Sequence, residues 1–298
     1  MRAGGIHHSY HVCGHLGGTA RADRPREPRA ADCGGGRMSN TDSIARRARR
    51  GEKLDDVVII DAHGHLGRFF NFPTATANAE GVLGVMDRVG VDCICVSAHV
   101  AAVGTDFVRG NDEIVGAVQG FPGRFFGYTT VFPNRAEGVL PEIQRCEREG
   151  LRAFKIHNFH GKKYTDDAYQ PAFAYANERS WPVLAHTYGP EVPVIRELAQ
   201  RYLHVTWICA HSGVAQFEDY LGIGKDLDNV YLEICSSLSG NRRIEIFVRE
   251  VGAHKVLYGS DAAFIAMTPQ IGRVALARIT EDEKRQILGL NAKRIFGL

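Results

Sequence analysis

The sequence contains no run of about 18 consecutive apolar residues, the length that a membrane-spanning helix needs. The N-terminal region also lacks the uninterrupted apolar segment of a secretory signal, because its arginines are scattered among Gly and Pro. We therefore expect neither a membrane span nor secretion. Hydrophobic residues nevertheless make up 44% of the 298 residues, enough to bury a large core.

The seven cysteines include no CxxC pair, and their number is odd. Most lie in apolar runs such as Cys93-Ile94-Cys95-Val96. This usage is typical of small buried side chains in a reducing compartment and excludes a disulfide framework. The sequence therefore predicts a cytoplasmic protein.

Basic residues are not in excess over acidic residues beyond the N-terminal segment. Residues 1–50 carry ten Arg, no Lys and four acidic residues, whereas residues 51–298 carry 26 basic and 30 acidic residues. The larger part of the chain lacks the basic excess that binding nucleic acid through counterion release requires. We therefore expect no nucleic-acid partner.

Motifs for phosphate binding and serine catalysis are missing too. There is no Gly-rich phosphate loop or Walker motif, and Gly259-Ser260-Asp261 does not match the G-x-S-x-G elbow. A P-loop nucleotide site and a nucleophilic serine on such an elbow are thus excluded.

Composition divides the chain at about residue 50. Residues 1–50 are rich in Gly and Arg, which predicts a disordered tail, and residues 51–298 are expected to form a single domain. Met38, followed by Ser-Asn-Thr-Asp, would be a natural chain start. We therefore regard residues 1–37 as dispensable or untranslated in the cell.

From Val57 onward, short apolar segments alternate with helical segments, which implies right-handed βαβ units. Closing eight strands gives an α/β fold of the (β/α)₈ TIM-barrel type, with its active site at the carboxyl ends of the strands. An open doubly wound sheet would not gather the ends of the first, fifth, sixth and eighth strands. The predicted strands are Val57–Ile60, Cys93–Ala98, Phe125–Phe132, Ala153–His157, Val183–His186, Val205–Ala210, Val230–Ile234 and Val256–Gly259.

The segment Ile60-Asp61-Ala62-His63-Gly64-His65 follows the first predicted strand. Because side chains alternate along a strand, His63 and His65 are expected on one face. We assign Asp61 to the opposite face, where it could orient neighbouring backbone. Two adjacent neutral imidazoles suit a transition metal, most commonly Zn²⁺. Ordinary strand histidines are the alternative.

Three other predicted strands end in a possible ligand or base, namely His186, His211 and Asp261. A single buried histidine is often satisfied by backbone contacts, and a buried carboxylate by a structural ion pair. Their shared position at strand ends favours a functional site, with Asp261 as ligand and general base.

These motifs resemble the amidohydrolase superfamily, in the amidohydrolase-2 branch that includes aminocarboxymuconate semialdehyde decarboxylase. The resemblance spans almost all of Val57 to Leu298. Where relatives continue after Gly-Ser-Asp with a bulky residue and proline, this chain has Ala262-Ala263-Phe264. The motifs are Asp61-Ala62-His63-Gly64-His65-Leu66, Ala185-His186, Ala210-His211-Ser212-Gly213, Gly259-Ser260-Asp261 and Asn291-Ala292-Lys293-Arg294-Ile295-Phe296.

The resemblance implies one divalent metal ion, for which Zn²⁺ is our expectation. It assigns metal binding to His63, His65, His186 and Asp261, and implies that His211 orients or deprotonates the water that attacks the substrate. Such an enzyme would be a hydrolase acting on an amide, lactone or ester. The alternative is non-oxidative decarboxylation of an unsaturated or aromatic acid at the same site.

Further assignments concern the substrate. Lys155 and His157 share one face of the fourth predicted strand, and Arg68 could anchor a carboxylate through its bidentate fork, although a surface arginine would look the same. In two-metal relatives a carbamylated lysine on this strand bridges the ions. We favour substrate or carboxylate binding for Lys155, and hence one metal. Glu233 and Cys235 share a face of the seventh predicted strand and receive no role.

A barrel that keeps a metal only for structure or binding is the non-enzymatic alternative. The intact ligand set together with His211 argues against it, because a structural zinc site needs no free base. We expect a small-molecule substrate as partner. A homo-oligomer follows from family analogy alone.

Overall fold

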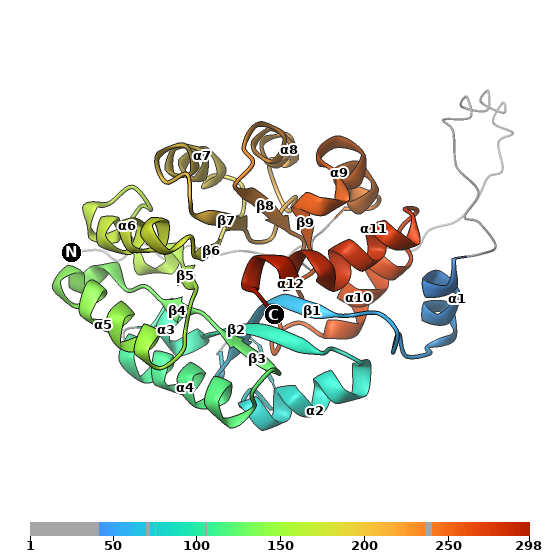
Figure 1. Cartoon of the computed structure of the whole chain (residues 1–298), viewed down its shortest axis with the longest axis horizontal. Helices are drawn as coiled ribbons and strands as arrows, with labels where there is room; N and C mark the ends of the chain where they lie inside the picture. Colours follow the sequence, from blue (N-terminus) through green and yellow to red (C-terminus); the bar gives the residue numbers. More distant parts are fainter. Residues whose placement is uncertain (1–41, 70–71, 75, 105, 236–239) are drawn as a thin grey trace, which may run out of the picture. The chain divides into compact units, whose positions relative to one another are not determined.

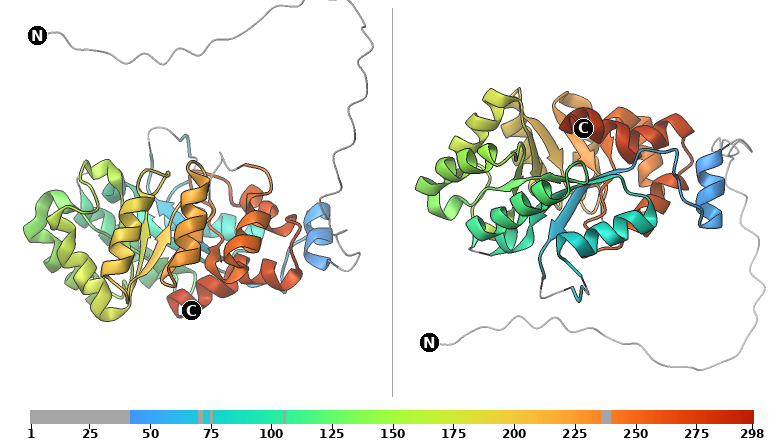
Figure 2. Two further views of the ribbon diagram at one scale, coloured as in Figure 1. Left: turned by 90° about the horizontal axis from the view of Figure 1, so that it is seen from above. Right: turned by 60° about the horizontal axis from the view of Figure 1, so that its bottom comes forward.

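A ring of short parallel strands forms the centre of the molecule, with helices around it (Figures 1 and 2). The computed structural model describes residues 42–298 except 70–71, 75, 105 and 236–239. Its strands are β1 (Ile60–Leu66), β2 (Cys93–Ala98), β3 (Phe125–Gly127), β4 (Thr129–Thr130), β5 (Phe154–Ile156), β6 (Pro182–Ala185), β7 (Thr206–Cys209), β8 (Val230–Glu233) and β9 (Val256–Leu257).

Helices follow most strands and pack on the outside of the ring (Figure 1). Asn78 caps the first turn of α2, and Thr280 and Glu283 form a capping box at the start of α11. The helices are α1 (Ser43–Arg50), α2 (Ala79–Val89), α3 (His99–Val103), α4 (Phe107–Gly120), α5 (Ala136–Arg148), α6 (Gln170–Arg179), α7 (Val192–Arg201), α8 (Phe217–Asp226), α9 (Arg243–Val251), α10 (Met267–Ala275), α11 (Glu281–Arg285) and α12 (Asn291–Phe296). Shorter turns are η1 (Pro133–Arg135), η2 (Asn158–His160), η3 (Asp167–Tyr169), η4 (Ala253–Lys255) and the π-helical η5 (Gln286–Leu290).

The described strands pair in two parallel sheets, β1-β2-β3 and β4-β5-β6-β7-β8-β9. β3 and β4 are halves of one predicted strand, with Tyr128 between them. The N–H of Tyr128 donates to Val96 O over 2.9 Å, and the N–H of Thr129 donates to Ala153 O over 2.8 Å. The two sheets are therefore continuous at this edge.

The opposite edge is joined just beyond β9. The N–H of Ala62 donates to Tyr258 O over 3.0 Å, and the N–H of Asp261 donates to His63 O over 2.8 Å. Gly64 and Ala262 form a parallel bridge in the same stretch. These bonds join β1 to the segment that follows β9, and the predicted (β/α)₈ barrel is confirmed.

The predicted bounds of the first strand, Val57–Ile60, are wrong, because β1 begins at Ile60 and runs through both histidines to Leu66. Residues before it leave the sheet, and Val58 is 37% exposed. The strand can remain buried through His63 and His65 because both imidazoles find polar partners at the end of the barrel. By contrast, the bounds of β2, Cys93–Ala98, are those predicted.

Helix α1 alters the expectation for the N-terminal segment. Residues 43–50 were expected to belong to a disordered tail, but they form a helix with Ile44 and Ala45 fully buried. Asp42 caps this helix and also forms a buried ion pair with Lys284. Residues 1–41 of the expected tail lie outside the described residues, so the predicted division of the chain stays a prediction.

The five described cysteines, Cys93, Cys95, Cys146, Cys209 and Cys235, are buried and form no disulfide, as the apolar runs predict. Cys13 and Cys33 lie outside the described residues. No helix within the described ranges combines the length and apolar character needed to cross a membrane.

The inside of the barrel has a small apolar core of its own. Ala62, Cys95, Leu184 and Ile208 belong to it, together with Ala292 and Phe296 from α12. The ring of Phe296 packs against Phe126 and Tyr128 at centroid distances of 4.9 and 5.9 Å. Helix α12 therefore closes this core at one end, which leaves the other end for the polar residues of the site.

Replacing Phe296 with alanine should therefore lower the free energy of unfolding by about 3 kcal/mol, because it empties the contact between α12 and the inner core. Urea unfolding followed by circular dichroism measures this. Leu290→Ala is the control, since this side chain is 44% exposed and its loss should change stability by about 0.5 kcal/mol at most. Equal losses in both variants would contradict a closing role for α12.

Candidate active site

The polar residues of the site come from the carboxyl ends of β1, β5, β6, β7 and β8 and from the segment after β9. Lys155 lies in β5, and His186 and His211 follow β6 and β7 directly. In a barrel of parallel strands these ends converge at one mouth. Side chains that lie far apart in the sequence are thereby brought together.

His63, His65 and Asp261 form the first candidate metal group, with one ligand atom from each lying within 4.8 Å of the others. His65 Nε2 lies 3.2 Å from Asp261 Oδ1, and His63 Nε2 lies 3.8 Å from it. The Nδ1 of His65 is hydrogen-bonded to Ser97 Oγ at 3.1 Å. This arrangement leaves the Nε2 atoms of both imidazoles directed at the same carboxylate.

Burial and hydrogen bonding set the charges of this group. Burial would raise the pKa of Asp261, but the hydrogen bond with His65 and the nearby His63 and His211 outweigh it and hold that pKa below its usual range. Burial is also the main cause that lowers the pKa of His63 and of His65. An ionised carboxylate therefore faces neutral imidazoles, which is the protonation state that metal ligands require.

Asp61 is fully buried in β1. Strict alternation would place it on the same face as the two histidines of this strand, so its expected position on the opposite face does not follow from that pattern. The pairing of β1 with β2 shifts in register between Asp61 and Gly64. The Oδ1 of Asp61 accepts hydrogen bonds from the backbone N–H groups of His63, over 3.1 Å, and Ser260, over 2.9 Å. Burial raises the pKa of Asp61 to about 7. The side chain thus ties β1 to the segment that carries Asp261.

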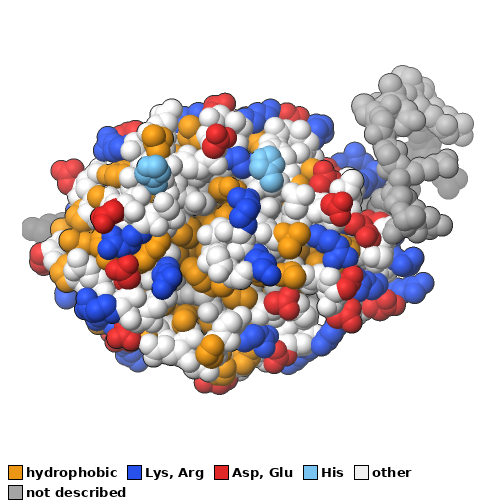
Figure 3. Space-filling model, viewed as in Figure 1, with side chains coloured by type: hydrophobic (Ala, Val, Ile, Leu, Met, Phe, Trp, Pro, Cys, Tyr) orange, Lys and Arg blue, Asp and Glu red, His pale blue; other side chains and the backbone are white. Residues whose placement is uncertain are grey.

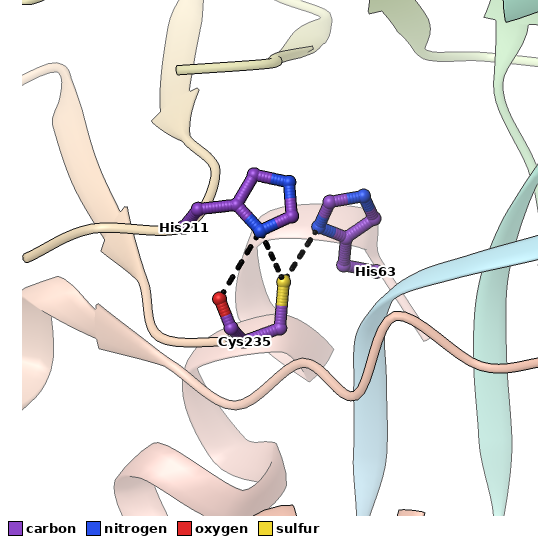
Figure 4. A group of neighbouring side chains, drawn as sticks. All are labelled: His63, His211 and Cys235. Atoms are coloured by element: carbon purple, nitrogen blue, oxygen red, sulfur yellow. Dashed lines mark hydrogen bonds between the residues drawn. The ribbon is translucent and has the colours of Figure 1, made fainter. Parts of the chain in front are cut away.

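His211 forms a second polar group with Cys235 and His63 (Figure 4). The Nδ1 of His211 lies 3.2 Å from the carbonyl oxygen of Cys235, and so donates to it. The Sγ of Cys235 lies 3.1 Å from His63 Nδ1 and 3.2 Å from His211 Nδ1. Because burial lowers the pKa of His211, its imidazole is neutral and its Nε2 is the accepting nitrogen.

His186 lies beside His211 and outside both candidate metal groups of the described residues. Its Nδ1 is 3.2 Å from His211 Nε2, and its ring stacks on His157 with 3.9 Å between the centroids. Since His211 Nε2 accepts, the Nδ1 of His186 donates, and the lone pair of His186 is on Nε2. Its assignment as a metal ligand stays a prediction.

The residues expected to bind the substrate differ in where they lie relative to the cavity of the site. His157 is buried and lines the cavity of the site, whereas Arg68 is exposed and does not line it. Lys155 is fully buried, and its Nζ lies 2.8 Å from His63 Nε2. Burial lowers the pKa of Lys155 to about 8. The structure thus places Lys155 against a candidate metal ligand and Arg68 away from the cavity.

A cavity of about 570 Å³ opens over His65, His186, His211 and Asp261. Most of its remaining lining is aromatic, and no Lys or Arg among the described residues lines it. His99 and His157 line it, and both histidines follow predicted strands closely enough to be singled out from the sequence. The other lining rings were not singled out, because aromatic residues in loops give no periodic signal. They belong to Phe69, Phe72, Phe159, Tyr188 and Phe264.

Glu233 is a further site residue to which the sequence assigned no role. Its carboxylate lies 2.9 Å from His63 Nδ1. The available signal was its position two residues before Cys235, on the same face at the end of a strand. A strand of parallel sheet that ends in an acidic residue is common, so this signal alone did not distinguish a site residue from a structural one.

Comparison with known proteins agrees with the geometry. The family model described as Amidohydrolase matches residues 60–298. The chain belongs to the amidohydrolase family. This family is metal-dependent, and the chain is an enzyme of it. No curated protein matches the chain.

Solved structures of amidohydrolases share the fold at low sequence identity. The 5-carboxyvanillate decarboxylase of Novosphingobium aromaticivorans, solved with bound manganese, has a TM-score of 0.67 and 15% identity, covering 82% of this chain and 98% of its own. The 2,6-dihydroxybenzoate decarboxylase from Rhizobium has a TM-score of 0.64 and 14% identity, covering 81% and 98%. A probable 2-pyrone-4,6-dicarboxylic acid hydrolase from Acinetobacter baumannii has a TM-score of 0.64 and 15% identity, covering 80% and 99%.

Replacing Asp261 with asparagine should weaken divalent-metal binding by more than about 100-fold, since it removes the negative charge that faces both histidines. Isothermal titration of the chelator-treated protein with Zn²⁺ measures the affinity and the stoichiometry, which we expect to be one ion per chain. His160→Gln is the matched control, because the Nε2 of this buried histidine bonds Ala101 O, away from the candidate ligands. An unchanged affinity in Asp261→Asn would exclude this carboxylate as a ligand.

Proposed function

We propose that this amidohydrolase is a metal-dependent hydrolase acting on an amide, lactone or ester of a small molecule. The observation that carries the proposal is the pairing of an ionised Asp261 with a neutral His211 at the mouth of one cavity. A hydrolase needs a proton acceptor for the attacking water and a proton donor for the leaving group. Either side chain can accept the proton of the water and, once protonated, donate it to the leaving group.

The residues that would hold the metal are His63, His65, His186 and Asp261. The chemistry of the donors fits a divalent ion, because two neutral imidazoles and an ionised carboxylate converge within 4.8 Å in three of the four. We propose Zn²⁺, which favours this mixture of nitrogen and oxygen ligands. The bound ion would supply Lewis acidity at the substrate carbonyl.

His211 is the residue we assign to proton abstraction from the attacking water. Its Nδ1–H is held by the carbonyl of Cys235, so the lone pair of His211 is on Nε2. In this structure Nε2 accepts from His186 Nδ1, and the attacking water would take the place of that hydrogen bond. Asp261 shares the cavity and is the other possible acceptor of this proton. Whichever of the two takes the proton from water would then return it to the leaving group.

A specific observation favours a second candidate, non-oxidative decarboxylation of an aromatic or unsaturated acid. Phe69, Phe72 and Phe264 form a stacked wall, with 5.9 Å between the first two centroids and 5.4 Å between the last two. Such a wall suits a planar ring. Two of the relatives above are named as decarboxylases of aromatic acids. In this reaction Asp261 or His211 would place a proton on the carbon that loses CO₂.

The absence of Lys and Arg from the described lining is our reason for placing hydrolysis first. A substrate with an extra carboxylate would find no cationic side chain there, and only the metal could bind that group.

For partners, the cavity size fits a small molecule. Basic and acidic side chains are mixed on the face seen in Figure 3, which supports our proposal that nucleic acid is not a partner. A cytoplasmic location and a homo-oligomeric state also stay proposals.

Replacing His211 with asparagine should reduce kcat by at least about 100-fold, because the proton acceptor is lost, while metal content stays at the wild-type value. Turnover of the identified substrate and elemental analysis of the same preparations measure both. His160→Gln again serves as the control and should retain turnover. Unchanged kcat in His211→Asn would show that another group accepts the proton.

A substrate panel decides between the two reactions. The metal-loaded enzyme should open lactones or cleave aryl esters without releasing CO₂, and the same panel should include hydroxybenzoic acids. Release of CO₂ from an aromatic acid, with no hydrolysis of any lactone or ester, would establish decarboxylation instead. Treatment with a chelator should abolish either activity, since both depend on the metal.

A further inference from the structure

Glu233 at the end of β8 is fully buried beneath the candidate metal group. Its Oε2 lies 2.9 Å from His63 Nδ1, 3.3 Å from the backbone nitrogen of His211 and 3.0 Å from Cys235 Sγ. Its Oε1 accepts from the backbone N–H of Cys235. All four groups around this carboxylate can donate a hydrogen, so it can act as acceptor throughout.

The partners of His63 on its two sides point to one tautomer. On the Nδ1 side a carboxylate accepts, which requires the proton on Nδ1. On the Nε2 side the ammonium of Lys155, which has only donors, lies 2.8 Å away. His63 is thus held with its lone pair on Nε2, which accepts from Lys155 and lies 3.8 Å from Asp261 Oδ1.

Space for this carboxylate depends on the absence of a side chain at Gly259. A Cβ at this position would lie 2.2 Å from Glu233 Oε1 and 2.9 Å from the Cβ of His63. Those distances are shorter than any normal contact, and the atoms concerned are held in the hydrogen bonds above. The sequence between β9 and Asp261 is therefore adapted to the pair formed by Glu233 and His63.

We propose that Glu233 is a positioning residue that fixes the tautomer and ring orientation of His63, and so keeps on Nε2 the lone pair that a metal ion would bind in place of Lys155 Nζ. The inference rests on the proposed function for the role of the metal, but the tautomer is a property of the metal-free protein as well. A carboxylate behind a metal-binding histidine typically changes metal affinity 10- to 100-fold when it is lost. Cys235, which also contacts His63 Nδ1, donates its thiol hydrogen to Glu233 and plays the smaller part.

Glu233→Gln tests this inference. The amide has the same shape as the carboxylate, but its NH₂ group is a donor placed among neighbours that are themselves donors. If the NH₂ faces His63, its Nδ1 must accept, and the proton moves to Nε2. We expect ¹⁵N NMR of histidine-labelled, metal-free full-length protein to show His63 protonated on Nδ1 in the wild type and on Nε2 in the variant. The signal is assigned by its loss in His63→Gln. Titration with Zn²⁺ should show affinity weakened about 10- to 100-fold in Glu233→Gln.

Glu142→Gln is the matched control. Glu142 is also a buried glutamate with several donors, Asn111 and Arg145 among them, but it lies in α5, and these partners are not candidate ligands. It should leave both the tautomer and the Zn²⁺ affinity unchanged. Cys235→Ala should likewise keep Nδ1 protonated, since the carboxylate remains.

The inference is overturned if wild-type His63 carries its proton on Nε2. The ¹⁵N NMR spectrum of the wild-type protein tests this even if Glu233→Gln does not fold. It is equally overturned if Glu233→Gln keeps the wild-type tautomer and Zn²⁺ affinity, or if Cys235→Ala alone moves the proton. Wild-type protein that binds no divalent ion would refute the proposed function instead, and the tautomers of wild type and variant would then decide the role of Glu233.

Discussion

The contact between β1 and the segment after β9 is the constraint on which the site depends. The hydrogen bond from the backbone N–H of Asp261 to His63 O joins the last segment of the barrel to the first strand. The same bond sets the carboxylate of Asp261 beside the imidazole of His65. Closing the barrel and assembling the candidate metal group are therefore one structural event. A protein that failed to form this edge would lose both.

Buried polar groups impose the second requirement, because each must find a partner when it leaves water. Asp61 meets it by accepting from the backbone on both sides of the closure, and Glu233 by accepting from His63, His211 and Cys235. These carboxylates do not face the cavity. Their contribution is to hold in place the histidines that do.

The sequence was sufficient for the fold because strand and helix periodicity repeats along the chain, and the family motifs occur in the expected order. It also indicated that His63 and His65 share a face, since that depends only on strand geometry. The position of Arg68 depends on the path of a loop, for which no periodic pattern exists. The partners of Lys155 and Glu233 depend on which strands lie opposite within the ring, and the sequence of one strand does not contain that information.

Two of the proposed catalytic residues occupy a backbone conformation that is costly for them. His211 has φ +56° and Asp261 has φ +62°, both in the left-handed region that residues other than glycine rarely adopt. Such a conformation persists only where surrounding contacts enforce it. For Asp261 these are the bond to His63 O and the bonds that Phe264 and Ile265 donate to its carbonyl, and for His211 the bond to Glu233. The contacts that stabilise these two turns therefore also set the directions of both side chains. As a result, His211 and Asp261 line the same cavity.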